Sequence, residues 1–179
     1  MANTNDPDGF TPAYHMYGGT IRPARMRIAS ATNASIFSGD VVNLSSGLVI
    51  QGTATGTPLG VFAGVEYQAT DGSVVFSKVW TADTATLGSA NAKAYVYSDP
   101  DIVYEAQSTG TPTQASIGTT NTISTTAGDS NTGRSKEGVT TTTSSGIATV
   151  VGFVDRPDNS IGQYARLYVI FPASVFGNN

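Results

Sequence analysis

Asp99, Asp101 and Glu105 are the carboxylates whose spacing best suits paired acid–base chemistry. Glycoside hydrolysis needs two carboxyl groups about 5–9 Å apart across a cleft, and residues two apart on a strand meet that spacing. The Asp-Pro-Asp sequence at 99–101 is also typical of a turn, in which aspartate side chains accept hydrogen bonds from backbone N–H groups. We favour the turn, and no serine or threonine has a base placed beside it to activate it as a nucleophile. The sequence therefore predicts that the chain is not an enzyme.

The sequence also contains few residues or motifs that could form a metal or cofactor site. His15 is the only histidine and there is no cysteine, so neither a histidine pair nor a thiolate set is available to a transition metal. Residues 5–9 begin like a calcium-binding loop, but Pro7 interrupts the loop and Tyr17 stands where a bidentate glutamate is needed. No Gly-Lys-Ser/Thr phosphate cradle is present. We expect no metal and no cofactor.

The composition excludes several classes of protein. A chain of 179 residues is long enough to bury a sizeable core. Charged residues make up only 12%, and the net charge of −4 argues against a nucleic-acid partner, because phosphate binding requires clustered lysine and arginine. No stretch approaches the ~20 apolar residues of a membrane span, and residues 1–10 do not resemble a secretory signal. These features predict a soluble protein made in the cytosol, without a membrane partner.

Residues 1–26 are predicted to form an extended N-terminal arm. Proline and glycine interrupt this segment repeatedly, so no periodic element survives in it. Its aromatic residues Phe10, Tyr14 and Tyr17 are not typical of disorder, which is poor in such side chains. We therefore expect the arm to become ordered against either its own domain or a partner.

A basic cluster lies where this arm meets the first predicted strand. It contains Arg22, Arg25 and Arg27, with no acidic residue between them. The cluster fits either a solvated corner of the domain or an anchor onto an acidic surface.

Residues 27–179 are predicted to form a single all-β domain. Short β-branched runs separated by Gly, Pro and Ser turns predict strands, and residues 38–67 predict a tightly wound antiparallel sheet with a hairpin at 45–47. Glycines within 59–67 predict close packing or a bulge. Pro100 predicts either two strands or one kinked edge strand over 95–105, and residues 82–93 are predicted to be a loop. The remaining predicted strands cover 26–31, 36–44, 48–50, 73–80, 147–154 and 164–171.

Residues 108–145 form a long insertion rich in Thr, Ser and Gly. Its large aliphatic residues are Ile117, Ile123 and Val139. Loops of this length within a domain are uncommon, and they tend to be functional or disordered. The spaced aliphatic residues favour a partly ordered excursion that packs on the sheet or reaches a neighbouring subunit.

The order of several segments resembles that of small decoration, or cement, proteins of tailed-bacteriophage capsids. The resemblance spans most of residues 26–171, and its motifs are segments 38–42, 56–64, 95–101 and 152–159. It implies a compact antiparallel β-barrel or β-tulip-like domain with the N-terminal arm and the Thr/Ser-rich excursion attached. It also implies a homotrimer, with a dimer as the other possibility. Such proteins are made in the host cytoplasm and bind the exterior of the virion.

The function that this resemblance implies is structural. Copies would lie over junctions between major capsid protein subunits and stabilise the contacts between them. The resemblance supplies no catalytic residues, and it assigns capsid binding to the arm. By position, the arm offers Phe10, Tyr14, Tyr17, Arg22, Arg25 and Arg27 as capsid-binding residues.

Two other functions remain open from the residues alone. One is a carbohydrate-binding or adhesin-like β-module on a virion surface, with an aromatic platform built from Trp80, Tyr95, Tyr97 and Tyr104. The other is a glycan-active enzyme that uses the three carboxylates at 99–105.

Overall fold

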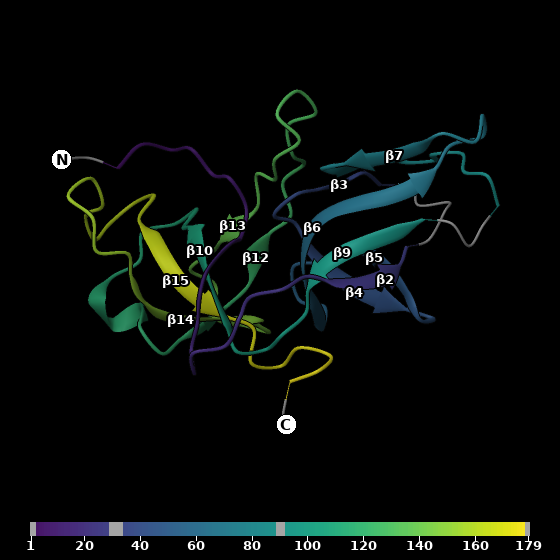
Figure 1. The fold of residues 1–179 in the computed structure, drawn as a ribbon. Coiled ribbons are helices and arrows are strands. Elements are labelled where there is room, and N and C mark those ends of the chain that lie inside the picture. Colours follow the sequence, from purple (N-terminus) through teal and green to yellow (C-terminus); the bar gives the residue numbers. More distant parts are fainter. Residues whose placement is uncertain (1–2, 29–33, 89–91, 178–179) are drawn as a thin grey trace.

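The computed structural model describes residues 3–28, 34–88 and 92–177. Within these ranges the protein is all-β, as predicted, and its only helical element is the short 3₁₀ turn η1 (Gln114–Ser116). None of the helical structure described has the length and apolar character needed to cross a bilayer. Two main sheets lie side by side, with the smaller strands β12 (Ile123–Ser124) and β13 (Gly138–Val139) between them (Figure 1).

The first main sheet, sheet A, has five antiparallel strands. The N-terminal strand β1 forms one edge, and a short strand from the Thr-rich insertion forms the other. In spatial order the strands are β1 (Thr11–His15), β10 (Ile102–Gln107), β15 (Arg166–Ile170), β14 (Ala148–Phe153) and β11 (Thr120–Asn121).

The second main sheet, sheet B, is also antiparallel. Its order is β2 (Ala24–Arg27), β9 (Lys93–Tyr97), β6 (Pro58–Gln68), β4 (Val41–Ser45) and β5 (Leu48–Gln51), with β7 (Val74–Ser77) paired to the second half of β6. Two small ribbons pair β12 (Ile123–Ser124) with β13 (Gly138–Val139), and β3 (Ile36–Phe37) with β8 (Val79–Trp80). The end strands of sheet B, β2 and β5, meet at one isolated bridge between Ile28 and Val49, and the described strands do not close into the barrel that was expected.

Local turn chemistry explains the predicted hairpin and bulges. Ser46 and Gly47 both have positive φ, 50° and 78°, which is what a two-residue turn between β4 and β5 requires. Along β6 the register shifts between Phe62 and Gly64, which confirms the predicted bulge. A side chain at Gly60 would overlap the Tyr97 carbonyl oxygen, so glycine is needed there for close packing.

The break at Pro100 separates two strands, which resolves the alternative left open by the sequence. The backbone N–H of Asp101 donates a hydrogen bond to Asp99 Oδ1 at 2.9 Å, as expected of an aspartate turn. Strands β9 and β10, on either side of this turn, are interior strands of different sheets.

Two predicted strand boundaries need correction. The single strand predicted over 73–80 is divided at Lys78 into β7 and β8, which pair with different partners. The first predicted strand, 26–31, starts two residues earlier as β2, and its residues 29–31 lie outside the described residues. The predicted loop 82–93 also includes undescribed residues, 89–91, and its last residue begins β9.

The described residues form two hydrophobic cores, one mainly against sheet A, to which Val41 and Val61 of sheet B contribute, and one against sheet B. The core of sheet A includes Phe10, whose ring lies 5.3 Å from that of Phe171. The core of sheet B includes Trp80, which packs edge-on against Tyr67 at 5.5 Å. The N-terminal segment is therefore part of the folded domain through Phe10 and through strands β1 and β2.

The insertion 108–145 is also tied to the domain. It contributes η1, β11, β12 and β13, and its Ile123 and Val139 are buried in the core of sheet A. Beside β3, the Ser135 N–H donates to the Ser38 carbonyl oxygen at 2.9 Å and the Ser38 N–H donates to the Gly133 carbonyl oxygen at 3.1 Å. This segment packs on its own sheet, which was one of the two arrangements expected.

Candidate interaction surfaces

Two of the three carboxylates at 99–105, Glu105 and Asp99, already have partners within the fold. Glu105 accepts ion pairs from Arg156 at 3.1 Å and from Arg166 at 3.4 Å, so its charge is already compensated. Asp99 is engaged in the turn that precedes β10. This arrangement supports the structural interpretation of these residues.

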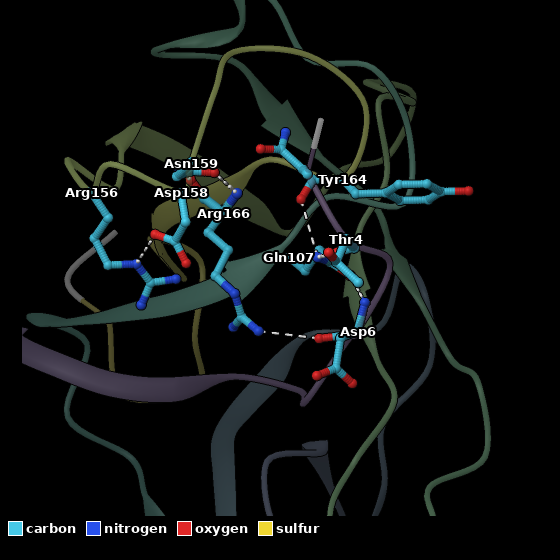
Figure 2. A pocket seen from close by; sticks show the side chains of 9 residues that line it. Thr4, Asp6, Gln107, Arg156, Asp158, Asn159, Tyr164 and Arg166 are labelled. Carbon is cyan, nitrogen blue, oxygen red and sulfur yellow. Dashed lines mark hydrogen bonds and ion pairs between the residues drawn. The ribbon is translucent and has the colours of Figure 1, made fainter. Parts of the chain in front are cut away.

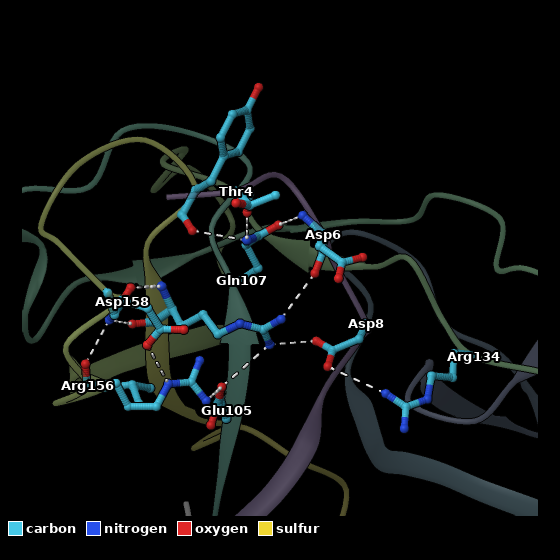
Figure 3. Close-up of polar contacts among 12 residues, drawn as sticks. Thr4, Asp6, Asp8, Glu105, Gln107, Arg134, Arg156 and Asp158 are labelled. Carbon is cyan, nitrogen blue, oxygen red and sulfur yellow. Dashed lines mark hydrogen bonds and ion pairs between the residues drawn. The ribbon is translucent and has the colours of Figure 1, made fainter. Parts of the chain in front are cut away.

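A network of arginines and carboxylates joins the N-terminal segment to sheet A (Figure 3). Arg166 Nη1 lies 2.7 Å from Asp8 Oδ1, and Arg134 Nη1 lies 3.9 Å from the other oxygen of the same carboxylate. Two guanidinium groups therefore face Asp8, which makes the calcium-like segment 5–9 unsuited to a cation.

A cavity of about 400 Å³ lies beside this network (Figure 2). Its lining groups already bind one another: the Gln107 amide donates to the carbonyl oxygens of Thr4 at 2.8 Å and Tyr164 at 3.1 Å, and accepts from the Asp6 N–H at 2.9 Å. Polar groups that already hydrogen-bond to one another hold the chain in place, and they have few free donors or acceptors left to recognise a ligand. We interpret this cavity as structural.

His15, Asp99 and Asp101 form the most metal-like cluster among the described residues, with one ligand atom of each lying within 4.8 Å of the others. The His15 ring is already committed, because its Nδ1 accepts the Tyr17 N–H at 3.2 Å and its Nε2 lies 3.2 Å from Asp99 Oδ2. An Nδ1 that accepts a hydrogen bond leaves the proton on Nε2, whereas a metal at Nε2 requires that proton to be absent. The cluster therefore stabilises the turn that contains Tyr17, by joining it to Asp99 through His15.

Addition of millimolar Ca²⁺ or Zn²⁺ should leave the thermal midpoint of the protein unchanged. A ligand that binds the native state raises this midpoint, and the His15 hydrogen bonds leave no free ligand atom on the ring to start such a site. Differential scanning calorimetry with and without each ion measures the effect. An increase that His15→Ala removes would contradict the assignment.

Asp40 and Glu137 form a buried acidic pair that the sequence did not predict. Asp40 Oδ2 accepts the Phe37 N–H at 2.7 Å, and Glu137 Oε2 accepts the Val41 N–H at 2.8 Å. The second oxygen of each carboxyl is buried without a hydrogen-bond partner in the described structure. Burial, with the nearby Asp40 charge, raises the pKa of Glu137 to about 9, and burial raises the pKa of Asp40 to about 6.

This pair lies where the insertion docks against the turn between β3 and β4. Glu137 is therefore a neutral acid at neutral pH, and it holds the first residue of β4 by its backbone. In the sequence it follows Arg134, Ser135 and Lys136, a polar run that is more typical of a solvated surface. No local signal distinguishes it from an exposed glutamate.

The six predicted capsid-binding residues are divided among three places. Phe10 lies in the core, where its ring packs on Phe171, so its side chain is not part of the exposed surface. Tyr14, near the end of β1, and Tyr17, in the turn that follows it, are both exposed. The three arginines lie in or beside β2 of sheet B, and all are exposed at the surface.

We call the first exposed site the Tyr17 turn, meaning residues 14–18 with Asp99 and Asp101. Tyr17 is 77% exposed at a turn closed by the Gly18 N–H, which donates to the His15 carbonyl oxygen at 3.2 Å. The Met16 N–H donates to the Asp101 carbonyl oxygen at 2.8 Å, which places the two carboxylates beside the turn. The described ion pairs join neither Asp99 nor Asp101 to a lysine or arginine. This surface is aromatic and acidic.

We call the second site the basic face, meaning the outward side of β2, β9, β6 and β7 together with Lys78. Cross-strand registry places Arg27, Lys93, Glu66 and Phe76 in one row across these four strands. Glu66 pairs with Arg25, while no described ion pair involves Arg27, Lys78 or Lys93. The opposite side of this sheet packs in the core. A chain with net charge −4 thus presents a positive face at this sheet.

A groove with apolar walls crosses the basic face. Its walls are Phe76, which is 70% exposed, and Tyr95, and its floor includes Gly64, which contributes no side chain. Lys78 also lines the groove, whose volume is about 360 Å³. No pattern in the sequence predicts this groove, because its residues come from separate strands.

The aromatic platform considered for carbohydrate binding does not form. Trp80 is fully buried in the core of sheet B, and Tyr104 is buried in that of sheet A. Tyr95 and Tyr97 remain half-buried on β9. Rings that lie in two different cores cannot stack together on one sugar.

Comparison of the chain with protein-family models, curated protein sequences and solved structures finds no significant match.

Proposed function

We propose that this chain is a structural virion protein that binds the outside of a bacteriophage capsid and stabilises contacts between major capsid protein subunits. It acts without a cofactor and without catalysis, as a homotrimer or a dimer on the virion exterior after synthesis in the host cytoplasm. The β-tulip-like arrangement that the family resemblance implies stays part of this proposal.

The observation that carries the proposal is the basic face. Arg27 and Lys93 project from a sheet whose other side is already buried, so these cations are available to a partner. Exposed cations on one face of a sheet suit an acidic protein surface, because they steer the encounter and fix the orientation of the complex. Many copies on one shell would add avidity to a modest single contact.

The position of the carboxylates supports a binding role over an enzymatic one. Glu105 is compensated by two arginines, and Asp99 accepts a hydrogen bond from the Asp101 N–H within its own turn. A general acid or base needs a proton-transfer partner within a cleft, and these side chains are instead engaged in holding the chain.

Arg27→Glu should weaken binding to a capsid by about tenfold or more, since it places a negative charge on the surface that faces an acidic partner. Purified protein is mixed with emptied phage shells that lack it, and co-sedimentation is measured over a range of protein concentrations. The wild-type protein should bind saturably.

Lys136→Glu is the matched control, because it makes the same change in charge at an exposed position away from the basic face. Point variants are preferable to deletion of residues 1–27, which would also remove β1, β2 and the core residue Phe10. A wild-type protein that does not co-sediment with shells, or two variants that bind equally well, would contradict the proposal.

A further inference from the structure

We propose that the groove on the basic face receives the Tyr17 turn of a second copy of this chain, so that copies associate head to tail. The proposal does not rest on the capsid-binding function, because it concerns contacts between copies in solution.

The groove is built to accept a large apolar side chain. Phe76 and Val74 are 70% and 60% exposed on neighbouring outward positions of β7, which is a large exposure for side chains of this kind. Ala63 and Gly64 keep the floor low between Phe76 and Tyr95. The volume of about 360 Å³ has room for an aromatic ring.

The Tyr95 wall is held in place before any partner arrives. Its phenol donates a hydrogen bond to Glu66 Oε2 at 2.6 Å, and the Arg25 guanidinium lies 5.5 Å from the centre of its ring. Arg25 also pairs with the same glutamate, which closes the network. The Tyr95 hydrogen bond, assisted by Arg25, lowers the pKa of Glu66, so this carboxylate stays ionised at neutral pH. A wall fixed in this way loses little conformational entropy on binding.

The Tyr17 turn has the matching shape and charge. Tyr17 is the most exposed of the large hydrophobic side chains described, and it projects from a short hydrogen-bonded turn. Asp99 and Asp101 lie beside it without a cationic lysine or arginine partner among the described ion pairs. An aromatic side chain flanked by carboxylates complements an apolar groove lined by Lys78.

The geometry favours a head-to-tail contact over a face-to-face contact. Two basic faces would bring like charges together, and two Tyr17 turns would do the same with carboxylates. The two surfaces lie on different parts of the chain, one after β1 beside sheet A and the other on β2, β9, β6 and β7 (Figure 1). A contact between unlike surfaces closes into a ring or continues as a chain of copies.

Sedimentation velocity of the purified protein over a range of concentrations tests this contact. We expect the wild-type protein to associate, and we expect Tyr17→Ser and Phe76→Ser each to raise the dissociation constant by about tenfold or more. Ile161→Ser is the control, because it removes another large apolar side chain that is 55% exposed outside both surfaces. Circular dichroism confirms that each variant is folded.

A charge exchange makes the test specific. Lys78→Glu and Asp101→Lys should each prevent association alone, because each opposes like charges across the contact. Mixing the two variants should restore association, since the unchanged groove of Asp101→Lys then receives the unchanged Tyr17 turn of Lys78→Glu, and the two introduced side chains also have opposite charges. A protein that stays monomeric at every concentration, association that survives Tyr17→Ser and Phe76→Ser, or a mixture that fails to associate would overturn the proposal.

Discussion

Glu137→Gln is expected to stabilise the protein above neutral pH, by roughly 1–3 kcal/mol in the free energy of unfolding. Glutamine retains the oxygen that accepts the Val41 N–H, and its amide group cannot ionise. In the wild-type protein the buried Glu137 carboxyl must hold a proton that the unfolded chain releases near its ordinary pKa of 4.5. The substitution removes this requirement.

The direction of the pH dependence follows from the raised pKa. Between pH 4.5 and about 9 the folded state binds more protons than the unfolded state at Glu137, so this residue lowers the stability as the pH rises through that window. Asp40 contributes in the same direction between its ordinary value of 3.8 and about 6. Urea unfolding of the wild-type protein at a series of pH values should show this loss, and Glu137→Gln should remove the part above about pH 6.

Two further variants separate the charge from the packing. Glu137→Ala should destabilise the protein by about 2–4 kcal/mol, because it leaves the Val41 N–H without its acceptor and opens a cavity. Asp83→Asn is the control: it neutralises an exposed carboxylate at a left-handed position that asparagine tolerates, so its effect should be small. A Glu137→Gln protein with the same slope as wild type between pH 6 and 9 would show that Glu137 is ionised in the fold.

Phe10→Ala is expected to destabilise the protein by about 3–5 kcal/mol, as for other buried aromatic residues. The Phe10 side chain is 1% exposed and packs against Phe171, and its backbone N–H donates to the Gly39 carbonyl oxygen at 2.9 Å. The N-terminal segment thus packs against its own domain, which was one of the two alternatives expected for it. Chemical denaturation followed by circular dichroism measures the loss.

The fluorescence of Trp80 provides a second signal in this experiment. It is the single tryptophan and lies in the core of sheet B, whereas Phe10 lies in that of sheet A. If the two sheets unfold together, Phe10→Ala shifts the fluorescence and circular dichroism transitions equally. Tyr17→Ala, an exposed aromatic residue of the same segment, should cost less than about 0.5 kcal/mol. A Phe10→Ala cost as small as this would mean that the segment is a free arm.

Features set by neighbours in sequence were predicted well. The hairpin at 45–47, the bulge in β6 and the Asp-Pro-Asp turn each depend on the backbone preferences of a few adjacent residues. For the same reason, the all-β class followed from short β-branched runs between turn residues. The closed barrel did not follow, because closure depends on how distant strands pair.

Features set by distant contacts were missed. Phe10 resembles the other aromatic residues of an extended arm until Phe171 is placed against it, and Glu137 resembles a surface charge until it meets Val41, 96 residues away. The predicted set of capsid-binding residues was likewise divided, because β1 and β2 belong to different sheets although only eight residues separate them. The Tyr17 turn and the basic face differ in charge and lie apart because the turn follows β1 of sheet A, whereas the basic face includes β2 of sheet B.

The most direct test of the proposed function is to locate the protein on a virion. Electron microscopy of purified virions labelled with a gold-conjugated antibody against this chain shows which part of the particle carries it. We expect gold over the outer surface of the capsid shell, on intact particles that have not been opened. Gold confined to the tail, or an absence of label on intact particles, would contradict a protein that binds and stabilises the outside of the capsid.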